Sequence, residues 1–349
     1  MSWLFGWRNR IKITIDSSKV SETLTNFPVY INLSSDSGIY SADLTGVFDE
    51  LSSNNNRKRI AITTMSGTTE VQCPVEIESW DDASEQAYLW VKAPTVYSGI
   101  DTDLYLYYDS THSDNTAYVG DTGDSPAQNV WDDNFIVVFH MSQDPSGGSD
   151  SILDSTSNGN HGTPVNMDSS NLQDILTRKG LKYNGSNEYI NCGNDSSLNL
   201  TSAITIEGII ELSSKASHQD IVAKHWNSAS GDVDALWYVQ YHYLSDYIQF
   251  GVHHSDSGVT TIGVGNGSIS VDTPCYFTFT HDTTDGMIGY YNGNFDDDDA
   301  HNDSIQTSSD NLYVNSFRYS GTNYNRFSGK STEYRISSIK RSPAWIKTN

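Results

Sequence analysis

Apolar and polar residues alternate at every second position in many short segments of this chain, and no other feature limits its fold as much. In residues 10–16, for example, Ile11, Ile13 and Ile15 are apolar and their neighbours are polar or charged. Such a period of two places the apolar side chains on one face of a β-strand. The 26 Gly and 21 Tyr residues are also typical of strands and turns. The sequence therefore predicts an all-β chain.

The expected strands fall into two groups. They lie at residues 10–16, 27–33, 59–64, 70–78, 87–92 and 104–108, and then at residues 135–139, 204–212, 236–243, 247–252, 275–281, 287–291, 313–317 and 333–339. Between the groups, residues 111–129 are rich in Asp, Ser, Thr and Gly and have no strand pattern, which is typical of a linker. We therefore expect two β-sandwiches: residues 1–110, with a docking or structural role, and residues 130–349.

Charge and hydropathy exclude several classes of function. With 44 acidic and 20 basic side chains the net charge is −24, which repels nucleic-acid phosphates. The longest apolar run, residues 135–139, is far shorter than the roughly 20 residues of a membrane-spanning helix. Arg8 and Arg10 interrupt the amino end before an export signal could form. Because the three cysteines are widely spaced, we expect free, buried thiols.

Two parts of the chain resemble known families. Residues 7–15, 24–29, 90–94 and 104–108 are similar to an uncharacterised prokaryotic β-domain that opens with a Trp/Arg motif and precedes lectin-like modules. The later segments resemble the laminin-G-like, concanavalin-A-type jelly rolls, on the motifs at residues 137–141, 154–162, 204–207, 327–329, 333–337 and 341–346. The second resemblance implies that residues 130–349 form a jelly roll of this type.

The jelly-roll resemblance also implies a structural calcium ion, with Asp154 as a ligand. At the position of the family's second acid this chain has Thr332, which removes one charged ligand. The acidic run at residues 296–299 lacks the alternation and the glycine of a calcium loop, so we interpret it as a solvated loop tip. His253 and His254 point to opposite faces of a strand and cannot hold one ion together.

The carboxylates give no pattern typical of a glycoside hydrolase, which needs two carboxyl groups about 5–9.5 Å apart. Glu76 and Glu78 flank Ile77, as on the wet face of an ordinary strand. Glu207 and Glu211 share a face but lie about 13 Å apart on a strand. We therefore expect a protein that is not an enzyme and has no catalytic residue.

Carbohydrate binding is the activity that the sequence favours, because lectins stack sugar rings on aromatic side chains. In residues 236–243, alternation places Trp237, Val239, Tyr241 and Tyr243 on a core face and Tyr238, Gln240 and His242 on a wet one. Further aromatic and amide side chains lie in loops or at strand edges. The candidate glycan-binding residues are Trp226, Tyr238, Gln240, His242, Tyr290, Tyr319, Asn323 and Tyr324. Tyrosine is also abundant in sandwiches that bind nothing.

These observations lead to one main functional hypothesis and three alternatives. A lectin-like domain without an export signal suits a non-catalytic virion structural protein, such as a head decoration, fibre or tail adhesin, that attaches to host-surface glycans. Its partners would be other virion or surface-assembly proteins, those glycans and further copies of itself, with neither nucleic acid nor membrane insertion. The alternatives are a cellular surface or secreted carbohydrate-binding protein, a purely structural decoration protein and, third, a glycoside hydrolase.

Overall fold

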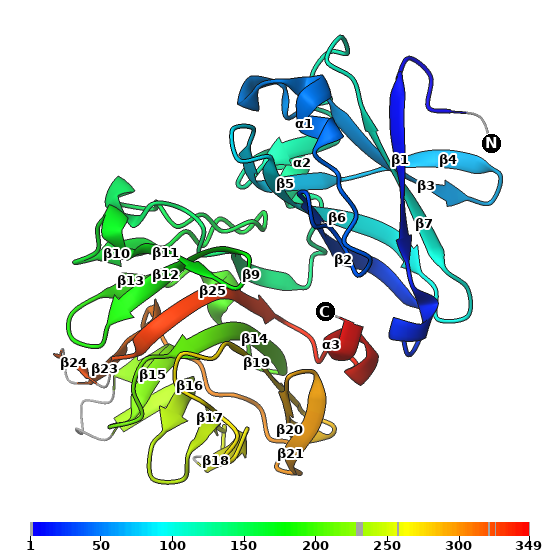
Figure 1. Cartoon of the computed structure of the whole chain (residues 1–349). Helices are drawn as coiled ribbons and strands as arrows, with labels where there is room; N and C mark the ends of the chain where they lie inside the picture. The colour runs from blue at the N-terminus through cyan, green and yellow to red at the C-terminus, as the bar shows by residue number, and fades with distance from the viewer. Residues whose placement is uncertain (1–2, 228–232, 257, 320–321, 325, 349) are drawn as a thin grey trace. The chain divides into compact units, whose positions relative to one another are not determined.

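The computed structural model in Figure 1 describes residues 3–227, 233–256, 258–319, 322–324 and 326–348. The chain folds almost entirely into antiparallel β-sheets, which confirms the all-β fold class. It divides into two compact units, here unit 1 (Met1–Asp132 with Lys347–Asn349) and unit 2 (Asp133–Ile346). Within the described residues, every helix is too short or too polar to cross a membrane.

Unit 1 contains two four-stranded sheets with a common core. The first has the order β1 (Asn9–Ile15), β7 (Thr102–Tyr108), β3 (Ile60–Ser66), β4 (Thr69–Cys73), and the second has the order β2 (Leu24–Leu33), β6 (Gln86–Val96), β5 (Val75–Asp81), β8 (Val119–Asp121). The helix α1 (Gly46–Leu51) adds Val47, Phe48 and Leu51 to the core. The other short helices of this unit are η1 (Ser17–Lys19), η2 (Asn54–Asn56) and α2 (Ser125–Gln128).

The expected linker at residues 111–129 is not a linker, because it folds as part of unit 1. Its strand β8 pairs with β5 in parallel, and α2 buries Ala127. The basic residues Arg57 and Lys58 hold its acidic side chains: Arg57 lies 2.7 Å and Lys58 2.8 Å from Asp121. The strand β8 has three residues and is too short to show alternation in the sequence. The acidic residues that suggested a linker form these ion pairs instead. The boundary between the units lies at Asp132.

Glu76 and Glu78 are buried, contrary to the expectation of a wet face. The carboxylate of Glu76 accepts hydrogen bonds from Trp131 Nε1 at 2.6 Å and from Thr122 Oγ1 at 2.7 Å. Glu78 accepts one from Trp90 Nε1 at 2.9 Å. The segment that follows β8 covers this face of β5, so both faces of the strand are buried and its glutamates are bound by indole N–H groups.

We predict that Trp131→Phe lowers the free energy of unfolding of the full chain by about 1–3 kcal/mol beyond the cost of lost volume, because Glu76 then loses a donor in a buried site. Trp80→Phe is the matched control, since the indole nitrogen of Trp80 has no hydrogen-bond partner within the described residues. Urea denaturation of both variants measures the difference. Equal losses in the two variants would contradict the role of the Trp131–Glu76 hydrogen bond.

Unit 2 is a sandwich of two larger sheets. The seven-stranded sheet has the order β10 (Thr163–Val165), β13 (Tyr189–Asn191), β22 (Leu312–Val314), β15 (Gln219–Asn227), β16 (Val233–His242), β17 (Tyr247–His253), β18 (Val259–Val264). The eight-stranded sheet has the order β11 (Leu172–Ile175), β12 (Arg178–Asn184), β25 (Ser328–Ser337), β14 (Ala203–Leu212), β19 (Cys275–Asp282), β20 (Gly286–Tyr291), β21 (Asn294–Asp299), and β9 (Phe135–Phe139) also pairs with β25.

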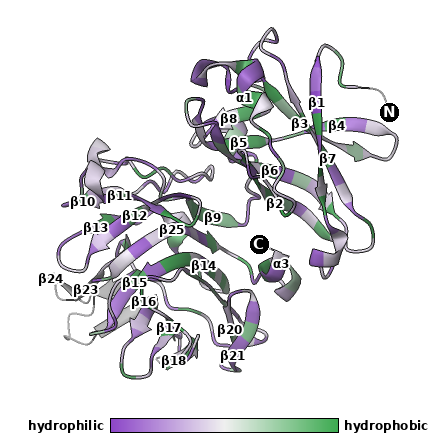
Figure 2. Ribbon diagram, in the orientation of Figure 1, coloured by the Kyte–Doolittle hydropathy of each residue, from purple (hydrophilic) through white to green (hydrophobic). Residues whose placement is uncertain are grey.

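Smaller elements connect these strands. They are η3 (Pro145–Gly147), η4 (Ser169–Asn171), η5 (Ser196–Leu198), the strand pair β23 (Phe317–Tyr319) and β24 (Thr322–Tyr324), and the helix α3 (Pro343–Thr348). Side chains from both large sheets form one core, which includes Trp237, Phe250, Phe277 and Phe279. Figure 2 shows the resulting alternation of hydrophobic and hydrophilic residues along the strands. All three cysteines are buried and free, as expected.

The acidic run at residues 296–299 is a strand and not a loop tip. It forms most of β21, at the edge of the eight-stranded sheet. Asp297 accepts a hydrogen bond from the backbone N–H of Gly263 at 2.9 Å, and Asp296 accepts one from Gly265 at 2.6 Å. Gly263 lies in β18, the edge strand of the other sheet. These carboxylates therefore satisfy backbone groups that an open sheet edge would leave exposed.

Candidate functional site

The side chains of β16 alternate between a buried and a half-buried face, as the sequence predicts. Trp237, Val239 and Tyr241 are buried in the core of unit 2. Tyr238, Gln240 and His242 lie half-buried on the outer face of the seven-stranded sheet. Tyr243 was expected on the core face, but β16 ends at His242 and the side chain of Tyr243 is 41% exposed.

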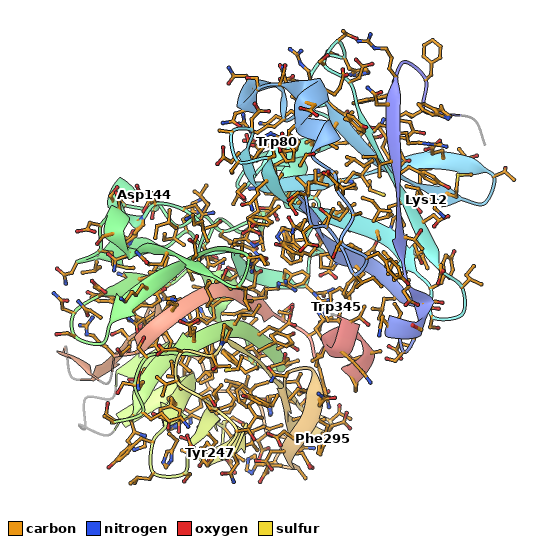
Figure 3. The ribbon with its side chains drawn as sticks, viewed as in Figure 1. Lys12, Trp80, Asp144, Tyr247, Phe295 and Trp345 are labelled. Carbon is orange, nitrogen blue, oxygen red and sulfur yellow. The ribbon has the colours of Figure 1, made fainter. Side chains whose placement is uncertain are left out.

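Two tyrosine rings lie over glycines of the neighbouring strands. In the sheet register, Tyr238 is opposite Gly251 and Gln249 is opposite Gly263. A Cβ atom added to Gly251 would lie 2.3 Å from Cζ of Tyr238, and one added to Gly263 would lie 2.6 Å from Cδ2 of Tyr247. Because these glycines have no side chains, each ring leans across the sheet and covers the next strand. The outer face thus presents two aromatic surfaces, and Figure 3 labels Tyr247 on β17.

Amide groups lie between the two rings. Gln240 is directly opposite Gln249, and its Nε2 donates a hydrogen bond to Oε1 of that residue. Within the described residues, the carbonyl of Gln240 and the amide of Gln249 have no further hydrogen-bond partner. The next residue in the same row is Asp220 on β15, which is buried and whose Oδ2 has no hydrogen-bond partner within the described residues.

Burial shifts the pKa values of Asp220 and of its neighbour Tyr238. Burial raises the pKa of Asp220 well above its usual range. Burial and the nearby Asp220 and Tyr247 raise the pKa of Tyr238 to about 12. The Tyr238 hydroxyl is therefore neutral at ordinary pH and can both donate and accept a hydrogen bond.

A cluster of rings continues this face at one end. His242 stacks on Tyr247 at a centroid distance of 5.1 Å and an interplanar angle of 17°. The ring of His218 meets His242 at 4.4 Å and Tyr243 at 4.8 Å, both edge-on. Burial, with a smaller effect of His242, lowers the pKa of His218, so His218 is neutral at pH 7. We call Tyr238, Gln240, His242, Tyr247 and Gln249 together the platform face.

The other predicted glycan-binding residues do not join the platform face. Tyr290 is wrong as a surface candidate: it is buried on β20 of the opposite sheet, where its ring meets Phe295 edge-on. Trp226 belongs to β15 and pairs with Asp234 in the register. Three more candidates lie in the β23–β24 pair, namely Tyr319, Asn323 and Tyr324. The side chains of Trp226 and of these three lie outside the described residues.

Tyr247, Gln249, His218 and Asp220 are the members of this region that sequence reasoning missed. Alternation in residues 247–252 does place Tyr247 and Gln249 on one face. The strand register was the missing information, because only pairing puts these residues beside Tyr238 and Gln240.

Asp154, the predicted calcium ligand, is fully buried and surrounded by hydrogen-bond donors. Its carboxylate accepts from the backbone N–H groups of Val138, Thr156 and Asn160 at 2.9–3.0 Å and from Thr156 Oγ1 at 2.9 Å. Burial raises the pKa of Asp154 to about 6, although these donors oppose the shift. The donors point at the oxygens that a cation would need.

Thr332 contacts the guanidinium group of Arg178. Its Oγ1 accepts a hydrogen bond from Arg178 Nε at 3.0 Å, and Arg178 Nη2 lies 2.6 Å from Glu333. Burial raises the pKa of Glu333, but the charges of His140, Arg178 and Arg335 outweigh it and lower the pKa. A calcium ion at Asp154 stays a prediction, and the geometry favours the ion-free arrangement.

We expect added Ca²⁺ to leave the melting temperature of the dialysed protein unchanged. Asp154→Asn should lower the free energy of unfolding by about 1–3 kcal/mol, because the amide cannot accept from every donor that faces it. Differential scanning calorimetry measures both effects, with the exposed Asp174→Asn as the control. A melting temperature that rises with Ca²⁺ in the wild type and not in Asp154→Asn would establish the calcium site.

Comparison with protein families matches one part of the chain. Residues 47–134 match the "Domain of unknown function (DUF2341)". This range supports the expected uncharacterised β-domain and lies almost wholly in unit 1. It begins after the Trp/Arg segment at residues 7–10, so that motif is not part of the match. No curated protein sequence matches the chain.

Several solved structures are similar in fold. The binding domain of Paraclostridial Mosquitocidal Protein 1 has a TM-score of 0.47 at 15% identity, over 62% of this chain and 51% of that one. The ligand-binding domain of botulinum neurotoxin serotype D, in complex with N-acetylneuraminic acid, has a TM-score of 0.46 at 13% identity, over 62% and 50%. The chain thus matches about half the length of these toxin domains.

A third structure comes from a different class of protein. Domain 4 of AbnA, a GH43 extracellular arabinanase from Geobacillus stearothermophilus, in complex with arabinotriose, has a TM-score of 0.43 at 13% identity. The match covers 61% of this chain and 97% of that domain. At such identities the likeness concerns the fold.

Proposed function

We propose that unit 2 binds a neutral, hydroxyl-rich carbohydrate on the platform face. The observation that carries this proposal is the pair of tyrosine rings that lean over Gly251 and Gly263, with a Gln–Gln pair between them. Aromatic faces interact with the C–H faces of sugar rings, and amides satisfy the hydroxyls. The proposal rests on this geometry.

The net charge narrows the class of carbohydrate. At −24 the protein repels sulfated or otherwise polyanionic glycans over distances within the Debye length. Neutral hexose or pentose chains carry no such penalty.

Binding should be weak per site and need many copies. A single platform offers two stacking rings and a few hydrogen bonds, so useful attachment depends on avidity. A virion structural protein, such as a head decoration, fibre or tail adhesin, presents many copies. We therefore propose a virion as the setting of this chain, in which the domain with the laminin-G-like motifs is the lectin part. In this setting unit 1 docks the chain to an assembly protein.

We predict that multivalent protein on a glycan array retains neutral oligosaccharides and that Tyr238→Ala and Tyr247→Ala each reduce retention about tenfold, since each removes a stacking surface worth about 0.5–1.5 kcal/mol per copy. Phe295→Ala is the matched control, because Phe295 is an exposed aromatic residue on the opposite sheet. Retention of anionic glycans alone, or equal losses in all three variants, would contradict the proposal.

Gly251→Ala tests the position of the ring without removing it. The new Cβ would displace the end of the Tyr238 side chain, and the backbone of Gly251 does not require a glycine. We expect reduced retention on the array with a melting temperature within a few degrees of the wild type. Gly99→Ala, where nothing lies within 4 Å of the added Cβ, is the control. Unchanged retention in Gly251→Ala would show that the Tyr238 ring does not contact the glycan.

The virion setting is tested separately. We expect the chain to co-purify with particles on a density gradient, detected by antibody. If the chain occurs only in the medium or on the producing cells, the cellular carbohydrate-binding alternative is correct. Incorporation into particles without retention of any glycan would identify a purely structural decoration protein.

A further inference from the structure

A second polar cluster of unit 2 contains none of the residues of the platform face. It forms where the chain leaves β17 and where it returns after β21. Asp256, His301 and Asp303 each offer one ligand atom there, and these atoms lie within 4.8 Å of one another. Two carboxylates and an imidazole are a donor set for a metal ion.

The spacing of the donors fits a small dication. Nε2 of His301 lies 3.3 Å from Oδ2 of Asp303 and 3.8 Å from Oδ2 of Asp256. Around a tetrahedral ion with bonds of about 2.0–2.2 Å, neighbouring donors are about 3.3–3.6 Å apart. The two His301 distances are close to this range, and all three donor atoms lie within 4.8 Å of one another, so the donors must approach by at most about an ångström to share one coordination sphere. His301 Nε2 is buried and makes no hydrogen bond within the described residues, so neither carboxylate already satisfies it.

Hydrogen bonds behind the ligand atoms support the arrangement. Oδ1 of Asp256 accepts from the backbone N–H of Gly258 at 2.7 Å, which leaves Oδ2 for an ion. The backbone carbonyl of Asp303 faces Nδ1 of His254 at 3.0 Å and Nε2 of His281 at 3.1 Å. Because a carbonyl only accepts, both nitrogens must donate. Two buried imidazoles therefore fix the backbone of Asp303.

His254 also supports His301 directly. Its ring lies 4.0 Å from that of His301, and its side chain is fully buried. With Nδ1 donating to Asp303, its Nε2 has a free lone pair and no partner within the described residues. A buried, unpartnered nitrogen on a ring that contacts the cluster is costly unless something compensates for it. A cation next to the cluster would do so.

We propose that Asp256, His301 and Asp303 bind a first-row transition-metal dication, with Zn²⁺ as the representative ion and solvent at the remaining position. The imidazole ligand favours Zn²⁺, Ni²⁺ or Cu²⁺ over Ca²⁺ and Mg²⁺, which prefer oxygen donors alone. The ion joins the segment after β17 to the segment after β21. His254 is a positioning residue for His301 and Asp303.

The test is titration of metal-stripped full-length protein with Zn²⁺ by isothermal calorimetry, with Co²⁺ absorption in the visible range as a second readout. We expect one ion per chain with a dissociation constant of about 1 µM or below. His301→Ala and Asp303→Asn should each weaken binding at least about tenfold. Asp256→Asn changes an exposed side chain and serves as the variant least able to disturb the fold.

His112→Ala, in unit 1, and Asp174→Asn, on β11 of unit 2, are the controls because they change residues that are not part of the cluster, and both variants should bind Zn²⁺ as the wild type does. A tenfold excess of Ca²⁺ should not displace Zn²⁺. The proposal is overturned if the wild type binds no Zn²⁺ below about 1 mM, or if folded His301→Ala and Asp256→Asn bind as tightly as the controls. Neither result depends on glycan binding.

Discussion

The packing of the two sheets of unit 2 against each other determines which side chains can meet a ligand. A strand in a sandwich buries one face, and the side chains of the other face point away from the core. With Trp237, Val239 and Tyr241 in the core, Tyr238, Gln240 and His242 must lie outside. The glycines at positions 251 and 263 then decide what the outer face offers, because side chains there would push the two tyrosine rings away from the sheet.

Hydrogen-bond donors and cations of the chain hold several of its buried carboxylates. Glu76 is held by the indole of Trp131, Asp154 by three backbone N–H groups and Glu333 by Arg178 and Arg335. Buried acids need such partners to repay the cost of desolvation. Asp220 is buried too, yet its Oδ2 has no partner within the described residues.

The alternation of apolar and polar residues was sufficient to predict the fold class and to predict which side chains of β16 face the core. Both predictions depend only on the period of two. It failed where burial depends on a distant segment. Glu76 and Glu78 were expected in water, but the segment after β8 covers them and supplies Trp131 as a partner. The same segment was expected to be a linker because its composition is acidic and polar. Composition does not reveal that these acidic side chains form ion pairs with Arg57 and Lys58.

The sites show the same limit. Tyr247 and Gln249 join Tyr238 and Gln240 only through the register of β16 with β17. The sequence places His254 beside His253, whereas the ring of His254 contacts those of His281 and His301, which lie far along the chain. Tyr290 has the right residue type on a predicted strand, but it belongs to the opposite sheet. Pairing between distant strands is what a single sequence does not reveal.

Saturation-transfer NMR on the full chain with an array-selected neutral oligosaccharide tests the central claim most directly. Selective irradiation of aromatic protons should transfer saturation to the ring C–H protons of the sugar, and these should shift upfield when they lie over the tyrosine rings. The transfer should disappear in the Tyr238→Ala, Tyr247→Ala double variant. Transfer that persists at full strength in this variant, or bound sugar with no transfer in the wild type, would contradict binding on the platform face.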